Sequence, residues 1–181
     1  MKPKLAEAYM KTAETFAELS HARRRHVGAI VVKDDRIISI GYNGMPSGWD
    51  NNCEDKEYSS GDEGGWLSPE EIQEQWPHEE LVHEPQSDDT VWTHTRRFRL
   101  KTKPEVLHAE RNALDKLAKG NEGGLGATMF ITHAPCLECS KSIYGAGITQ
   151  VYYNEDYRST DGIEFLKKCN VNIEKLSKED K

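Results

Sequence analysis

The chain has 181 residues with a formal net charge of −7, enough for one ordinary domain with an elaboration. The acidic balance argues against non-specific binding to nucleic acid, which needs clustered Lys and Arg. No segment approaches the roughly 18 apolar residues of a membrane span, and the N-terminus lacks an apolar signal core. We therefore expect a cytoplasmic protein whose four cysteines stay reduced.

The first quarter of the chain predicts a helix followed by a hairpin. Residues 4–19 carry apolar side chains at helical spacing, and the short basic segment "SHARRRH" follows. Two β-branched runs, 27–32 and 37–40, flank Asp34 and Asp35, which is typical of a hairpin. A glycine-rich loop, "GYNGMPSG", then leaves the second strand.

Residues 49–100 differ in composition. From Glu54 to His94 there are thirteen acidic residues and one basic residue, Lys56, and such a run usually forms a solvated loop. However, disordered segments are poor in aromatic residues, so we expect part of this insert to pack on its own body or on a neighbouring subunit. "SPEEIQEQW" predicts a short helix capped by Ser68. The segment contains all four tryptophans: Trp49, Trp66, Trp76 and Trp92.

The insert also contains possible metal ligands. A second, structural zinc site is one interpretation of them, although their irregular spacing is unlike a compact zinc finger. Ordinary polar residues of a subunit-contact loop are the favoured alternative. The residues concerned are Cys53, His78, His83 and His94.

The remainder of the chain alternates regularly between helical and strand patterns. "HAERNALDKLAKG", "PCLECSKSIYGAG" and "DGIEFLKKCN" predict helices, whereas "ATMFITH", "ITQVYYN" and "VNIEKL" predict strands. With the hairpin, this order predicts one α/β domain over residues 1–181, built on a five-stranded mixed sheet between helices, with the insert at about 49–100.

Cys136 and Cys139 form a C-x-x-C pair that admits three interpretations: a redox disulfide, half of a structural zinc site, or part of a catalytic metal site. No second C-x-x-C exists to complete a zinc ribbon, and a thioredoxin-like pair would lie earlier in its fold. His108, 28 residues upstream of Cys136, supplies a third ligand. Three ligands leave the fourth zinc position open, as catalysis requires, and Glu110 is close enough to face a water there.

The spacing of H-x-E and P-C-x-x-C matches a stated signature of zinc nucleobase deaminases. On "HAERNAL", "APCLECSKSIYGAGITQVYY", "VGAIVVKDDRIISIGYNGMPSG" and "NEDYR", the chain resembles the cytidine and deoxycytidylate deaminase superfamily. The "GYNG" loop, with Ser20, Arg24 and Arg25 before it, favours the deoxycytidylate branch. The resemblance implies a three-layer α-β-α fold and hydrolysis of dCMP to dUMP and ammonia, feeding dTMP synthesis. It implies one catalytic Zn²⁺ per chain on His108, Cys136 and Cys139, and Glu110 as the group that moves protons.

The resemblance also implies the residues around the substrate. Asn43 is expected at the sugar, Ala134 beside the base, and Ser20, Arg24 and Tyr153 around the 5′-phosphate. His133 could line the pocket, but a histidine at a strand end is more often structural.

Regulation and assembly are further implications of the resemblance. Members of this branch are often hexamers activated by dCTP and inhibited by dTTP with Mg²⁺. An effector pocket at the glycine-rich loop, on Gly41, Asn43, Gly44 and Gly48, is one interpretation, and a simple strand-to-loop turn is the favoured alternative.

Two other classes of function stay open. A zinc deaminase could act on cytidine or on a base in RNA, although the acidic charge argues against RNA and the basic segment argues against a free nucleoside. A catalytically silent, zinc-stabilised binding module would have no use for Glu110.

Overall fold

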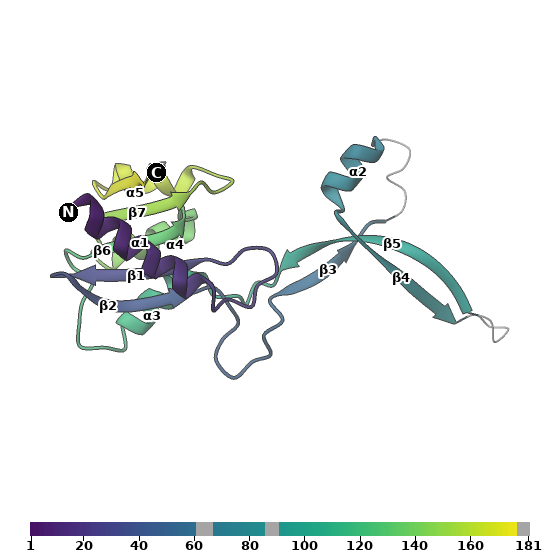
Figure 1. Ribbon diagram of the computed structural model, residues 1–181, viewed down its shortest axis with the longest axis horizontal. Coiled ribbons are helices and arrows are strands. Elements are labelled where there is room, and N and C mark those ends of the chain that lie inside the picture. The colour runs from purple at the N-terminus through teal and green to yellow at the C-terminus, as the bar shows by residue number, and fades with distance from the viewer. Residues whose placement is uncertain (61–66, 86–90, 177–181) are drawn as a thin grey trace. The chain divides into compact units, whose positions relative to one another are not determined.

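The structure is a computed structural model that describes residues 1–60, 67–85 and 91–176; Trp66 lies outside this range. Its contacts divide the chain into two compact units (Figure 1). Unit 1 comprises Met1–Cys53 and Glu105–Lys181, and unit 2 comprises Glu54–Pro104. Unit 2 falls within the region where the insert is expected, while a single domain over residues 1–181 stays a prediction.

Unit 1 contains the predicted five-stranded mixed sheet, in the order β2-β1-β6-β7-β8. Strand β1 is antiparallel to β2 and to β6, whereas β6, β7 and β8 run parallel. The strands are β1 (Gly28–Lys33), β2 (Arg36–Tyr42), β6 (Thr128–His133), β7 (Gln150–Glu155) and β8 (Asn172–Lys175). The helices are α1 (Pro3–Ala17), α3 (Ala109–Leu117), α4 (Leu137–Gly145) and α5 (Asp161–Lys168).

Alternating side chains of the central strands build two cores, one on each face of the sheet. On one face, Ile30 and Phe130 pack with apolar side chains of α1. On the other, Val31 and Ile131 pack with side chains of α3, α4 and α5. Helices therefore cover both faces, which confirms the expected three-layer α-β-α fold.

The β1–β2 hairpin turns where the sequence predicts. Asp34 and Asp35 have φ angles of 50° and 56°, so both turn residues adopt the left-handed conformation. Two consecutive left-handed residues are the mark of a type I′ turn, whose twist suits a two-residue hairpin.

Unit 2 is a three-stranded antiparallel sheet, in the order β3-β5-β4, accompanied by helix α2. Its elements are β3 (Glu54–Tyr58), α2 (Pro69–Gln75), β4 (His78–Pro85) and β5 (Val91–Thr102). The helix is predicted correctly: Ser68 and Glu71 form a reciprocal capping box, and Pro69 opens the first turn. The acidic run does not form the solvated loop that its charge alone would favour: it contributes β3 and β4, so part of the insert packs on its own body.

Charge pairing explains why this acidic run forms strands. Strand β5 carries arginines and lysines opposite the carboxylates of its two neighbours, and opposite charges across a sheet stabilise the pairing. Arg97 pairs with Glu79 at 2.6 Å, and Arg99 pairs with Glu57 at 2.6 Å. Arg99 also lies 4.7 Å from the ring centroid of Trp76, the indole of which is buried.

Within the three described stretches, no helix combines the length and the apolar composition that crossing a bilayer requires.

Candidate active site and metal centre

His108, Cys136 and Cys139 come together in unit 1. His108 is the N-cap of α3, Cys136 is the N-cap of α4, and Cys139 lies in the first turn of α4. The His108 Nδ1 atom is 3.6 Å from Cys136 Sγ and 3.4 Å from Cys139 Sγ, and all three ligand atoms lie within 4.8 Å of one another. The helix starts predicted from the sequence therefore converge, with their positive dipole ends at the triad.

The triad fits zinc. Tetrahedral coordination with Zn–N bonds of about 2.0 Å and Zn–S bonds of about 2.3 Å separates nitrogen and sulfur ligands by roughly 3.5 Å. The two measured N–S distances bracket this value. Neither N-cap side chain bonds to the backbone of its own helix, so both stay available as ligands. Three protein ligands are the number found in catalytic zinc sites, which keep one position open.

Close packing against the hairpin fixes the start of α3. A Cβ atom on Gly41 would lie 2.1 Å from the Ala109 carbonyl oxygen and 2.5 Å from the Ala113 nitrogen, so only glycine lets β2 and α3 approach this closely. Directly after β2, Gly44 and Leu107 exchange two backbone hydrogen bonds of 3.1 and 2.9 Å. Leu107 precedes His108, so both contacts hold the first zinc-ligand candidate against β2.

The two thiols titrate as a coupled pair. A hydrogen bond from the Cys139 thiol, with another from His108, lowers the pKa of Cys136 to about 3. The hydrogen bond with Cys136, together with burial, raises the pKa of Cys139. The bond with Cys136 raises the pKa of His108 against the effect of burial. The lowered pKa of Cys136 favours its thiolate, the form in which a cysteine binds metal.

Glu110 lies in the first turn of α3 and is buried, with a relative exposure of 4%. Burial raises its pKa, while the charge of His108 and a hydrogen bond with the Cys139 thiol act in the opposite direction. A carboxyl group with a raised pKa holds a proton more readily than an exposed one, which suits a group that must both accept and donate a proton. Its position beside the triad suits it to acid–base work there.

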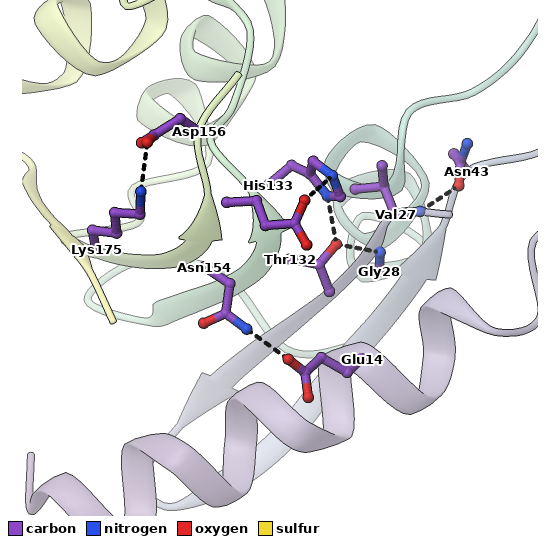
Figure 2. Close-up of polar contacts among 10 residues, drawn as sticks. Glu14, Val27, Gly28, Asn43, Thr132, His133, Asn154, Asp156 and Lys175 are labelled. Carbon is purple, nitrogen blue, oxygen red and sulfur yellow. Dashed lines mark hydrogen bonds and ion pairs between the residues drawn. The ribbon is translucent and has the colours of Figure 1, made fainter. Parts of the chain in front are cut away.

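Asn43 is held by the backbone of the segment before β1. Its Oδ1 accepts a hydrogen bond from the Val27 nitrogen at 2.8 Å (Figure 2). Its Nδ2 donates to the Arg25 carbonyl oxygen at 2.9 Å. The Asn43 nitrogen also donates to the Val27 carbonyl oxygen at 3.0 Å. The side chain expected at the sugar therefore also clamps the basic segment to the end of β2.

The other expected substrate residues lie in different environments. Ser20 is buried, and its hydroxyl accepts a bond from the Ala22 nitrogen at 3.2 Å. Arg24 is exposed. Ala134 and Tyr153 are buried, and the Ala134 nitrogen donates to the Glu155 carbonyl oxygen at 2.8 Å. The role of each at a substrate stays a prediction.

The three glycines expected at an effector pocket also differ from one another. The close approach of α3 to β2 accounts for Gly41. A Cβ atom on Gly44 or Gly48 would meet nothing within 4 Å, and Gly48 has a φ of 90°, which favours glycine. Effector binding at this loop stays a prediction.

The histidines of unit 2 do not gather. Among the described residues, His108, Cys136 and Cys139 are the only group of three or more His, Cys, Asp or Glu side chains close enough to hold a metal ion. His94 pairs with Val82 and His78 with Phe98, four positions along the ladder, or about 13 Å apart. His83 adjoins Val82 in β4, so it points to the opposite face of the sheet. All four cysteines lie in the described residues, and none forms a disulfide.

Sequence reasoning singled out His133 but missed its hydrogen-bond partners. Thr132 and Glu155 hydrogen-bond to His133 at the carboxyl ends of β6 and β7 (Figure 2). A signal was present, because a Thr-His pair ending an apolar strand leaves two polar side chains at the same edge as Cys136. The partner Glu155 lies 22 residues away and becomes visible only when β6 and β7 are paired.

Comparisons with known proteins agree with this geometry. Residues 3–155 match the family described as the cytidine and deoxycytidylate deaminase zinc-binding region. The deoxycytidylate deaminase of Enterobacteria phage T4 is 34% identical over 187 residues, covering 95% of this chain and 94% of the relative. The human deoxycytidylate deaminase is 31% identical, covering 86% of this chain and 67% of the relative. The crystal structure of the dCMP deaminase from the cyanophage S-TIM5, in complex with dCMP and dUMP, is similar with a TM-score of 0.70. It is 40% identical and covers 97% of this chain and 99% of that chain.

Proposed function

The chain belongs to the cytidine and deoxycytidylate deaminase family, and from this premise we propose that it hydrolyses dCMP to dUMP and ammonia. It is a zinc-dependent deaminase by family. The observation that carries the proposal is the His108–Cys136–Cys139 triad beside the buried carboxyl group of Glu110. A structural zinc site does not require a carboxyl group that transfers protons, whereas a hydrolytic site does.

In the proposed mechanism, the triad holds the metal and Glu110 moves protons. Zinc, when bound, would act as a Lewis acid and lower the pKa of a water molecule bound to it to about 7. Glu110 accepts a proton as the water oxygen adds to C4 and passes it to N3. It then takes the remaining proton from the new C4 hydroxyl group and delivers it to the departing amino group, while the C4–O bond becomes a carbonyl bond. The C4–N bond breaks and ammonia leaves, so the product is dUMP. Because burial raises the pKa of Glu110, the group can carry this proton between steps.

We assign the substrate contacts as follows. Asn43 binds the sugar and Ala134 lies beside the base. Ser20, Arg24 and Tyr153 surround the 5′-phosphate, where an arginine suits the planar, bidentate recognition of phosphate oxygens. The clamp from Asn43 to Val27 and Arg25 supports this arrangement, because it ties the basic segment to the end of β2, where Gly44 pairs with Leu107, the residue before His108.

A deamination assay over four substrates tests the proposal. Ammonia release from dCMP should exceed release from CMP, cytidine and dCTP at equal concentrations. A preference for CMP, cytidine or dCTP would overturn the choice of substrate but leave the zinc chemistry intact. Absence of turnover on every cytosine compound by zinc-loaded protein would favour a silent binding module.

We further propose that dCTP activates the enzyme and that dTTP, with Mg²⁺, inhibits it. We also propose that it assembles as a homohexamer and works in the cytoplasm, in the pyrimidine pathway that supplies dTMP. The resemblance to the deoxycytidylate branch supports these assignments. Adding dCTP should raise the rate at low dCMP, dTTP should lower it, and light scattering should give six chains per particle. A monomer with rates insensitive to both nucleotides would contradict them.

A further inference from the structure

A chain of side-chain hydrogen bonds crosses the edge of the sheet at the carboxyl ends of β6 and β7 (Figure 2). The Thr132 hydroxyl accepts a bond from the Gly28 nitrogen at 3.1 Å and lies 3.2 Å from His133 Nδ1. His133 Nε2 lies 3.0 Å from Glu155 Oε2. Thr132 is buried, the His133 side chain is 13% exposed and the Glu155 side chain is 70% exposed. We call this chain the Thr132–His133–Glu155 relay.

The relay replaces backbone pairing where the sheet ends. The ladder between β1 and β6 stops at the pair Ala29 and Ile131. One residue further on, Gly28 donates to a side-chain hydroxyl instead of a carbonyl group. The ladder between β6 and β7 stops at His133 and Glu155, the same two residues that are joined through their side chains. The relay therefore connects β1 to β6, and β6 to β7, at the positions where the backbone ladders between these strands stop.

The hydrogen-bond pattern assigns the protons of the relay. Because the Glu155 carboxylate can only accept, the proton of a neutral His133 ring lies on Nε2, and the Thr132 hydroxyl, which accepts from Gly28, donates to Nδ1. Nδ1 is then the acceptor of a neutral ring, and Nε2 carries the proton that is donated to Glu155. Burial lowers the pKa of His133, which favours the neutral ring; Glu155 opposes this shift and Arg25 adds to it. The guanidinium of Arg25 thus lies within electrostatic reach of the ring.

The relay connects the basic segment before β1, which the proposed function assigns to the substrate phosphate, with the loop that leads from His133 to the zinc-ligand candidates. On one side, Gly28 follows the basic segment that Asn43 clamps through Val27 and Arg25. On the other side, His133 precedes Ala134, the nitrogen of which donates to the Glu155 backbone, and the zinc-ligand candidates follow. A shift in the relay would move the basic segment relative to the metal site without removing a ligand.

We propose that His133 is a positioning residue that sets the distance between the basic segment before β1, which holds the substrate phosphate, and the loop leading to Cys136. It acts through Thr132 and Glu155 and touches neither the metal nor the reacting atoms. The inference rests on the proposed function and deepens it by naming the group that makes the enzyme respond to the phosphate of its substrate.

Replacing the relay residues tests the proposal. T132V keeps the shape of the side chain and removes the hydroxyl, and H133F keeps a ring without hydrogen-bonding groups. Each should raise KM for dCMP about tenfold, because a buried hydrogen bond is lost, while kcat stays within about twofold. The kcat/KM for deoxycytidine, which lacks the phosphate, should change less than about twofold. H133Q, which can still donate to Glu155, should recover part of the KM increase.

A matched control separates positioning from general loss of stability. The buried hydroxyl of Ser39 donates to the Ala113 carbonyl oxygen at 2.6 Å, away from the relay. S39A should lower the thermal stability and leave the ratio of kcat/KM for dCMP to that for deoxycytidine unchanged. Zinc content, measured by atomic absorption, should stay at about one per chain in T132V, H133Q and S39A.

Two outcomes would overturn the inference: equal losses of kcat/KM on dCMP and deoxycytidine, or an unchanged KM in zinc-loaded T132V and H133F. Calorimetric binding of dUMP and deoxyuridine makes the same comparison without turnover. Equal loss of both affinities contradicts the relay, whereas a wild-type protein that does not deaminate dCMP contradicts the proposed function.

Discussion

Replacing Gly41 with alanine should push α3 away from β2. The added Cβ atom would lie 2.1 Å from the Ala109 carbonyl oxygen, and α3 must retreat by about 0.9 Å to reach the 3.0 Å that real Cβ contacts keep. The nearest atoms on Ala109 and Ala113 are backbone atoms that no rotamer change can move. Overpacking of this kind costs up to about 3 kcal/mol. For a chain of this length, that corresponds to a fall of about 6–12 °C in Tm.

The same displacement should weaken the metal site. His108 begins α3, and a zinc site tolerates deviations of only about 0.2 Å in its ligand distances. Thermal unfolding and zinc content of G41A should both be measured beside G44A, in which the new Cβ atom meets nothing within 4 Å. G44A should keep its zinc and melt within about 2 °C of the wild type. If G41A behaves in the same way, the packing role given to Gly41 is wrong.

Three further outcomes are expected. A chelator should abolish turnover and lower Tm by several degrees, because the metal binds only the folded triad. Added Zn²⁺ should restore both the turnover and the Tm. An unchanged Tm would argue against a metal at this site. S68A removes the capping bond to the Glu71 nitrogen and should destabilise α2 by about 1 kcal/mol, detected as faster amide exchange over Pro69–Gln75; unchanged exchange would contradict the capping role. R99A removes the contacts with Glu57 and Trp76, which are partly solvent-screened, and should cost unit 2 about 1 kcal/mol; limited proteolysis at the wild-type rate would refute this.

Local patterns in the sequence were sufficient for much of unit 1. Asp34 and Asp35 favour a tight turn by their own chemistry, and His108 and Cys136 each precede a helical pattern, so their positions as N-caps follow from neighbouring residues. The convergence of the two helix starts was inferred from the chemistry of zinc, and the structure brings the three side chains together.

Unit 2 was less predictable because its stability depends on pairing between distant residues. The acidic run ends just before the basic residues of β5, and neither half predicts a strand until Glu57 faces Arg99 and Glu79 faces Arg97. The relay has the same character, since Gly28 and Glu155 meet the neighbouring pair Thr132 and His133 only after three strands align. Similarly, the motif around Asn43 indicates a substrate contact and gives no sign of its bonds to Val27 and Arg25.

The most direct test of the hydrolytic site is E110Q, with E138Q as its matched control. Glu138 is an exposed carboxylate in the first turn of α4, beside a zinc-ligand candidate, whereas Glu110 is buried beside the triad. E110Q keeps the shape of the side chain and cannot carry the proton, so kcat on dCMP should fall at least about 10²-fold while zinc content stays at that of the wild type. E138Q should keep the wild-type rate and zinc content. An E110Q protein that retains its zinc and most of its rate would contradict the role given to Glu110 and the hydrolytic site built on it.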